Sequence, residues 1–313
     1  SCRTLGVTDE ELEKIGGPSP SFRAFNRNKR SIALDLSSQA GRDVARRLIA
    51  AADVIVNNFR PGTMERWGLG YDDLRQAHPR LVYCDFNAYG STGPLGHIGA
   101  NDLALQAHSG LMSITGEEGG PPVRAGAAII DLHASLAIVS GVMAALYHRE
   151  KTGVGQRVET SLLQSSAHLM SYFYQDYWLT GNQHEPMGTA NHLSVPNQAF
   201  PTRDGYVIII APSDEMWKRC AQALDPDTLD TSRFRNASER LRLRKDVVAA
   251  MSEVTRHMGK HELHERLSAV KVNVSIVQDS GEAADHPQLK EIGGLFEFEA
   301  DGVASRYVAT PVT

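Results

Sequence analysis

Alternating strand-like and helix-like segments in the first hundred residues constrain the fold of this 313-residue chain more than any other feature. Short apolar runs at residues 32–36, 54–56 and 81–84 predict strands, and residues 38–52 carry apolar side chains at helical spacing. Strands that are joined through a helix lie parallel to each other in the sheet, and the connection is a right-handed crossover. The pattern therefore predicts an α/β fold with a Rossmann-like parallel sheet, whose ligands bind beyond the carboxyl ends of the strands.

Two further helices and a strand extend this unit. The apolar spacing predicts helices over residues 132–151 and 162–179, and residues 157–161 between them predict a strand. The second helix is apolar on most faces, so we expect it to be buried. Together with the preceding segments, these elements predict a large α/β domain over residues 1–195.

The pattern changes near residue 196, where we expect a second and smaller α/β unit. Its predicted strands and helices lie at residues 206–210, 216–224, 240–257, 260–269 and 272–277. The sequence thus predicts a small domain over residues 196–290. Residues 291–313 are expected to return to the large domain.

Charge and cysteine content exclude several classes of protein. The formal net charge of -5 leaves no general cationic surface for a phosphate backbone, so we expect no nucleic-acid partner. The cysteines at Cys2, Cys84 and Cys220 are widely spaced and predict neither a disulfide framework nor a thiolate zinc site. No continuous apolar run approaches the roughly 18 residues of a membrane span, and residues 1–13 lack an apolar signal core. We therefore expect a cytoplasmic protein without a membrane partner.

Familiar catalytic motifs are missing from the sequence. It contains no GxSxG nucleophile elbow, no phosphate-binding GxxxxGK[ST] loop and no HExxH pair. His257, His261 and His264 share one face of a predicted helix, but the charged residues among them indicate a solvated surface rather than a metal site. We therefore predict no bound metal.

Asp131 is the first candidate for chemistry, because it lies where a long helix begins. Free backbone N–H groups and the helix dipole favour an ionised carboxylate at such a position. An ordinary N-cap explains this placement as well as a function does. The functional alternative is a nucleophile that attacks a thioester carbonyl, which needs an anion in a dry pocket and donors for the oxyanion.

Several motifs in a fixed order add to this interpretation. They lie at residues 26–36, 57–62, 68–71, 101–102, 110–112, 115–116, 152–156 and 204–206, with Asp131 among them. In these motifs the chain resembles the family III CoA-transferases, which include formyl-CoA, carnitine and bile-acid CoA-transferases and have the α-methylacyl-CoA racemases as close relatives. The resemblance covers nearly the whole chain from about Phe25 and places the family's nucleophilic aspartate at Asp131.

The resemblance implies transfer of coenzyme A from an acyl-CoA donor to a carboxylic acid. In the family, the aspartate attacks the acyl-CoA to give a mixed anhydride, and the released thiolate then forms an aspartyl-CoA thioester. An acceptor carboxylate attacks that thioester and receives the coenzyme. This chemistry implies no cofactor beyond coenzyme A, which is itself a substrate.

The resemblance also implies which residues hold coenzyme A. Asn58 and Phe59 match positions that contact it, and Lys29 and Arg66 match basic positions near its phosphates. The ordinary explanations are an asparagine-rich turn beside a core aromatic and two solvated surface charges.

Two further positions bear on the choice of reaction. Asn101 and Asp102 match the pair that faces the catalytic aspartate and positions the acyl group, although a helix N-cap would also explain them. The racemases carry a titratable His where this chain has Asn101, which argues against racemisation because proton exchange needs two bases. A racemase or isomerase and a non-catalytic CoA-binding protein remain as alternatives. Gly188 lies in a loop that matches only loosely.

The resemblance implies a homodimer of two chains threaded through each other like linked rings. Family members open with a strand, a glycine-containing turn and a helix ahead of residue 26, and this sequence shows no such segment. Residues 5–15 instead resemble the helix that closes family members. We therefore expect a permuted chain or one joined from fragments. The donor and acceptor acids are not specified by the sequence.

Overall fold

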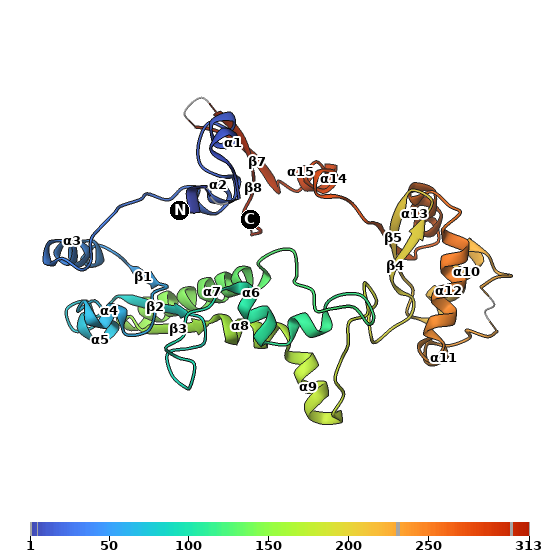
Figure 1. Ribbon diagram of the computed structural model, residues 1–313, viewed down its shortest axis with the longest axis horizontal. Coiled ribbons are helices and arrows are strands. Elements are labelled where there is room, and N and C mark those ends of the chain that lie inside the picture. Colours follow the sequence, from blue (N-terminus) through green and yellow to red (C-terminus); the bar gives the residue numbers. More distant parts are fainter. Residues whose placement is uncertain (1, 5, 230–231, 301–302, 313) are drawn as a thin grey trace. The chain divides into compact units, whose positions relative to one another are not determined.

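The computed structural model describes residues 2–4, 6–229, 232–300 and 303–312, and its fold is mixed α/β as predicted (Figure 1). The chain divides into two compact units, one of which covers Ala33–Leu193. The other combines Ser1–Ile32 with Ser194–Thr313. The domain boundaries expected at residues 195 and 290 stay a prediction.

A three-stranded parallel sheet forms the centre of the first unit. Its strands are β1 (Val54–Asn57), β2 (Val82–Asn87) and β3 (Arg157–Ser161), in the order β1-β2-β3. The parallel sheet predicted from the sequence is therefore confirmed. Because all three strands run in the same direction, Asn57, Asn87 and Ser161 end at one edge of the sheet.

The prediction of a strand at residues 32–36 is wrong. These residues are irregular, and the division between the two units falls within them. Leu34 and Leu36 still pack against the core formed by Ala45, Ile49 and Tyr83. Their apolar character thus reflects contact with a helix, and no described strand pairs with this segment.

Helices cover both faces of the parallel sheet. They are α3 (Gln39–Ala50), α4 (Thr63–Arg66), α5 (Tyr71–Leu74), α6 (Asp102–His108), α7 (Ile129–Thr152), α8 (Leu162–Leu169) and α9 (Ser171–Thr180), with a 3-10 turn at Leu111–Ile114. On one face α3, α4 and α5 pack around Tyr83. Near the carboxyl edge, Leu105 of α6, Ile130 of α7 and Leu162 of α8 form a second cluster.

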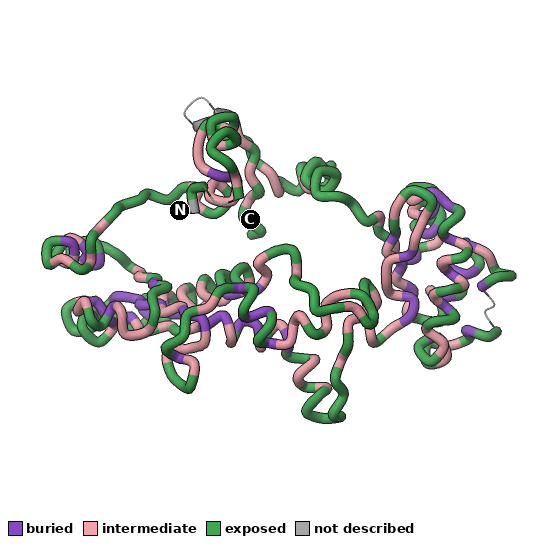
Figure 2. The backbone as a smooth tube through the Cα atoms, viewed as in Figure 1, coloured by how far each residue is buried: buried purple, intermediate pink, exposed green. Residues whose placement is uncertain are grey.

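The predicted helix at residues 162–179 divides at Met170 into α8 and α9, and its expected burial is wrong for α9. None of the described residues of α9 is buried, and Trp178 and Leu179 are 69% and 76% exposed (Figure 2). Helix α7 also exposes apolar side chains, among them Leu136, Val139 and Met143. By length and composition α7 could cross a membrane, so the expectation that no segment qualifies is wrong for this helix.

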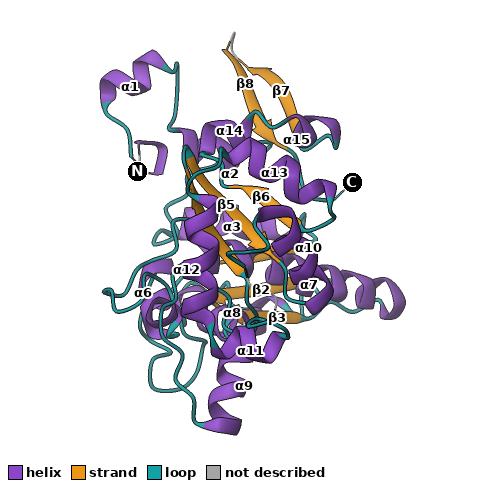
Figure 3. Cartoon of the chain, turned by 90° about the vertical axis from the view of Figure 1, so that its right-hand side faces the viewer, coloured by secondary structure: helices purple, strands orange, loops and turns teal. Residues whose placement is uncertain are grey.

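The second unit contains an antiparallel sheet with a core of its own. Its strands are β4 (Asn197–Thr202), β5 (Gly205–Ile210) and β6 (Asn273–Ile276), in that order. Helices α10 (Asp214–Leu224), α11 (Ala237–Arg242), α12 (Arg244–Thr255) and α13 (Lys260–Ala269) follow the chain between β5 and β6, and α10, α12 and α13 pack on this sheet (Figure 3). The sequence missed β4, which is polar at its start and contains Pro201.

Short elements near both termini complete this unit. They are a 3-10 turn (Cys2–Thr4), α1 (Asp9–Lys14), α2 (Pro20–Asn26), α14 (Ser280–Ala284), α15 (Pro287–Glu291), β7 (Leu295–Ala300) and β8 (Val303–Val308). Strands β7 and β8 form an antiparallel hairpin. Arg23 reaches it through a 3.3 Å contact between its Nη1 atom and Ser305 Oγ. Two segments far apart in sequence thereby pack together.

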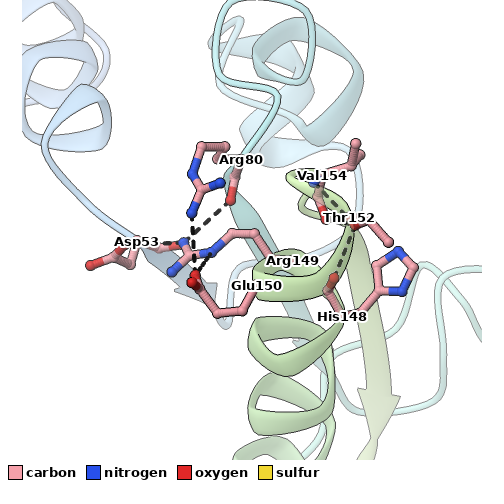
Figure 4. Close-up of polar contacts among 7 residues, drawn as sticks. All are labelled: Asp53, Arg80, His148, Arg149, Glu150, Thr152 and Val154. Carbon is pink, nitrogen blue, oxygen red and sulfur yellow. Dashed lines mark hydrogen bonds and ion pairs between the residues drawn. The ribbon is translucent and has the colours of Figure 1, made fainter.

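A buried arginine fixes the last turn of α7 to the amino edge of the parallel sheet (Figure 4). The Arg149 Nη1 atom lies 3.4 Å from the Asp53 carbonyl, 3.3 Å from the Arg80 carbonyl and 3.0 Å from Asp53 Oδ1. Asp53 and Arg80 precede β1 and β2. Since α7 ends at the edge where these strands begin, it begins at the edge where they end.

Replacing Arg149 by Met should lower the free energy of unfolding by about 1–3 kcal/mol, because two carbonyl groups lose a buried donor. Urea denaturation would measure this change. The matched control is Arg75→Met, which removes an exposed ion pair with Asp72 and should cost less than about 1 kcal/mol. Equal losses in both variants would contradict an anchoring role for Arg149.

Candidate active site at the carboxyl edge of the sheet

The first turn of α7 holds Asp131 at its third position rather than at the N-cap. The N-cap is Ala128, whose side chain makes no capping hydrogen bond. The ordinary N-cap explanation for Asp131 is therefore wrong. The free backbone donors of this turn are satisfied by a residue from another helix.

Asp102, at the start of α6, supplies that cap. Its Oδ2 atom accepts hydrogen bonds from the backbone N–H groups of Ile130 at 2.9 Å and Asp131 at 3.2 Å. Its Oδ1 atom accepts from Gln106 Nε2 at 2.6 Å, and Gln106 Oε1 accepts from the Ala125 N–H at 2.9 Å. Both Asp102 and Gln106 are buried. This chain of contacts fixes where α7 begins and which way its first turn points.

Asn101 has the ordinary structural role considered from the sequence. Its Oδ1 atom accepts from the Ala104 N–H at 3.1 Å and so caps α6. Asn101 is thus bound to its own helix, whereas Asp102 reaches across to α7. The sequence missed Gln106, although its position four residues after Asp102 placed it on the same helix face.

The charge state of Asp131 is set by its surroundings. Partial desolvation raises the pKa of the Asp131 carboxyl above its ordinary value, and the negative charge of Asp102 raises it further. Among the described residues, none donates a hydrogen bond to the Asp131 carboxylate in the interactions that the structure records. A more basic carboxylate without such a donor is a better nucleophile.

The turn after β1 brings three predicted residues together at the same edge. Asn58 Nδ2 donates to the Phe86 carbonyl at 2.9 Å, and Phe59 stacks edge-on against Trp67 with ring centroids 5.3 Å apart. Arg66 lies in the short helix that follows, where its Nη2 atom contacts Thr63 Oγ1 at 3.0 Å. All three residues, Asn58, Phe59 and Arg66, are exposed.

The end of β2 connects this turn with the start of α7. Phe86, whose carbonyl holds Asn58, also packs against the cluster that contains Ile130 and Leu105. The end of β2 therefore binds Asn58 through a hydrogen bond and packs against the cluster that contains Ile130, the residue before Asp131. The structure thus places Asp131 and the turn that carries Asn58 and Phe59 at one edge of the sheet.

Two other predicted residues lie elsewhere. Lys29 belongs to the second unit, where its Nζ atom lies 3.4 Å from Asn26 Oδ1. Gly188 adopts a φ of +60°, and its N–H donates to the Gly116 carbonyl at 2.7 Å. A loop matched only loosely in the sequence is thus tied to the 115–116 motif. Within the described ranges, no group of three or more His, Cys, Asp or Glu residues could hold a metal ion.

Replacing Asp102 by Asn should lower the pKa of Asp131, because removing a nearby negative charge favours the ionised carboxylate. The amide oxygen of the substituted side chain can still accept from the first turn of α7. A ¹³C NMR titration of the Asp131 carboxyl would measure the pKa directly. An unchanged or higher pKa of Asp131 in D102N would contradict coupling between the two carboxylates. The control is Asp72→Asn on α5, which should leave the pKa of Asp131 unchanged.

Known proteins are similar to this chain in sequence and in fold. The model of CoA-transferase family III matches residues 1–313. The human succinyl-CoA:glutarate CoA-transferase is 35% identical over 76% of this chain and 55% of its own length. The succinate–glutarate CoA-transferase of Agrobacterium fabrum is 31% identical over 93% of this chain and 73% of its own.

A solved structure agrees with these similarities. The CaiB/BaiF family protein from Brucella suis superimposes with a TM-score of 0.83 at 29% identity, covering 95% of this chain and 78% of that one. The chain spans about half the length of the human relative. The whole-chain match to the family model, supported by these relatives, shows that the chain belongs to CoA-transferase family III.

Proposed function

We propose that this protein transfers coenzyme A from an acyl-CoA donor to a carboxylic acid, with Asp131 as the covalent nucleophile. The observation that carries the proposal is the placement of Asp131 in the first turn of α7, beside the buried Asp102 charge and at the edge that holds Asn58. Membership of CoA-transferase family III supports the reaction type. Asn101, which caps α6, has no titratable group that could take up or release a substrate proton, and this favours transfer over racemisation.

The proposed reaction proceeds through two kinds of acyl exchange. The Asp131 carboxylate attacks the thioester carbonyl of the donor, the C–S bond breaks, and a mixed anhydride forms with release of the coenzyme A thiolate. That thiolate attacks the Asp131 carbonyl, which releases the donor acid and leaves an aspartyl-CoA thioester.

The acceptor acid reverses these steps. Its carboxylate attacks the Asp131 carbonyl of the aspartyl-CoA thioester, the thiolate leaves, and a second mixed anhydride forms. The thiolate then attacks the acceptor's acyl carbon, which yields the new acyl-CoA and frees Asp131. One activated acyl bond replaces another at each step, so the reaction needs no external energy source and no cofactor beyond coenzyme A.

We also propose the residues that hold the coenzyme. Phe59 offers an exposed ring for an apolar or aromatic part of coenzyme A, and Arg66 offers free guanidinium donors for its phosphates. Asn58 has its amide oxygen free after donating to Phe86. Lys29 belongs to the other unit, and its role as a phosphate contact stays a prediction from the resemblance. In the same proposal Asp102 positions the acyl group through the start of α7, and Asn101 does so through its cap on α6.

Short dicarboxylic acids are the proposed acyl groups. The human and Agrobacterium relatives are named for succinate or succinyl-CoA and for glutarate. We therefore propose succinyl-CoA as a first donor to test and glutarate as a first acceptor. A cytoplasmic location is proposed because Cys84 and Cys220 are both buried free thiols, which suits a reducing compartment.

A homodimer is proposed because a single chain exposes an extensive apolar surface. Leu136, Val139, Met143 and Tyr147 of α7 are each more than half exposed. Monomeric soluble proteins rarely leave such contiguous surfaces open. The proposed partner is a second copy threaded through the first, as in the family.

Mixing the protein with succinyl-CoA should add coenzyme A covalently to the peptide that contains Asp131, and glutarate should remove the adduct. Intact-protein mass spectrometry followed by peptide mapping would detect it. Asp131→Ala should lose the adduct and slow transfer by about 10⁴-fold, because the covalent path is gone. Asp72→Ala, an exposed aspartate on α5, is the control and should behave as wild type. Transfer by Asp131→Ala at the wild-type rate would disprove the covalent mechanism.

Light scattering should give a mass near twice 34.2 kDa for the native protein. Leu136→Glu should prevent this assembly, because the substitution places a charge in the proposed apolar interface. The matched control is Leu48→Glu on α3, where the leucine is 48% exposed outside that surface. A compact, folded wild-type monomer would exclude the interlocked dimer, since linked chains cannot separate without unfolding.

A further inference from the structure

A row of polar side chains crosses one face of the parallel sheet beneath the turn that holds Asn58 and Phe59. Asn57 Nδ2 of β1 lies 2.5 Å from Asp85 Oδ1 of β2. Asp85 Oδ2 in turn accepts from Arg157 Nε of β3 at 2.6 Å. Asn57 is 8% exposed, and the side chain of Asp85 is 14% exposed. Three strands are thus linked through a largely buried carboxylate.

The Asp85 carboxylate decides the orientation of the Asn57 amide. An ionised carboxylate accepts hydrogen bonds and donates none, so the Asn57 NH₂ group must face it. The Asn57 oxygen therefore points the other way, where it accepts from the Phe59 N–H at 3.2 Å. With the amide reversed, two donors would face each other at Phe59.

The contact between Asn57 and Phe59 sets the shape of the turn. A side-chain oxygen that accepts from the backbone two residues later closes an Asx turn. This turn determines where the Asn58 side chain and the Phe59 ring project. Asn58 adds a second tie through its contact with the Phe86 carbonyl.

Arg157 keeps Asp85 in place. Its guanidinium lies between Asp85 and Glu159, whose Oε2 atom is 3.8 Å from Arg157 Nη2. Glu159 Oε1 also accepts from the Ser91 N–H at 3.0 Å. The same charged row therefore holds the loop after β2 as well as the turn after β1.

We propose that Asp85, held by Arg157, is a positioning residue for acyl-CoA binding, because it orients the Asn57 amide that shapes the turn of Asn58 and Phe59. The inference rests on the proposed function and adds Asn57, Asp85 and Arg157 to it. None of these three touches the reacting atoms. Their loss should weaken coenzyme binding and leave the chemistry at Asp131 unchanged.

Calorimetry with coenzyme A and steady-state kinetics with succinyl-CoA and glutarate test this inference. Asn57→Ala leaves the Asp85–Arg157 pair intact, and Asp85→Leu removes the carboxylate. Both should raise the Kd of coenzyme A and the KM of the acyl-CoA donor by about tenfold, the effect of one lost buried hydrogen bond. The kcat and the KM of glutarate should stay within about twofold of wild type.

Two further variants separate positioning from stability. Asp85→Asn should show a smaller rise in Kd than Asp85→Leu, because the amide oxygen can still accept from Asn57. Asp53→Asn is the matched control, since it removes an aspartate paired with Arg149 at the opposite edge of the sheet. It should not change the Kd of coenzyme A.

The outcomes distinguish this inference from the proposed function. If the wild-type protein binds and transfers coenzyme A, and Asn57→Ala and Asp85→Leu leave the Kd of coenzyme A unchanged, only the positioning role is overturned. If the variants instead lower kcat and thermal stability and raise both KM values together, the role of these residues is merely structural. That outcome would also overturn the positioning role. A wild-type protein that neither binds coenzyme A nor transfers it would overturn both proposals.

Discussion

The capping of α7 by Asp102 is the contact on which the rest of the site depends. Helix α7 begins at Ile129 with no capping side chain of its own, so its first backbone donors need an acceptor from elsewhere. A buried carboxylate on α6 provides it and accepts from Asp131 itself. Partial desolvation raises the pKa of Asp131, and the negative charge of Asp102, which also fixes its position, raises the pKa further. Asp102 therefore contributes to both the geometry and the basicity of this site.

Contacts at both ends of α7 fix the position of Asp131. Arg149 binds the last turn to the segments that precede β1 and β2, and Asp102 holds the first turn near the end of β2. A helix of 24 residues rises about 36 Å, at 1.5 Å per residue. Two fixed points this far apart leave little freedom for the axis to tilt. The position of Asp131 relative to the sheet is therefore fixed by contacts at both ends of its helix.

The sequence could predict what depends on local pattern. The parallel strands near residues 54, 82 and 157 follow from short strand-like runs and the helical spacing between them. Contacts between distant segments were not predictable in this way. The cap on α7 comes from a residue 28 positions earlier, and the strand expected at residues 32–36 lacks a partner strand within the described chain. Periodicity likewise marked α9 as apolar without showing what would cover it.

The exposed apolar face of α7 bears directly on Asp131, the proposed nucleophile. Leu132 follows Asp131 and is 46% exposed, and Leu136 lies little more than one turn further on. Desolvation is already the largest cause of the raised Asp131 pKa in a single chain. If a second copy covers this face, as proposed, it removes more water from the carboxylate and raises its basicity further. Dimer assembly and activation of Asp131 would then be one event, because the same apolar surface governs both.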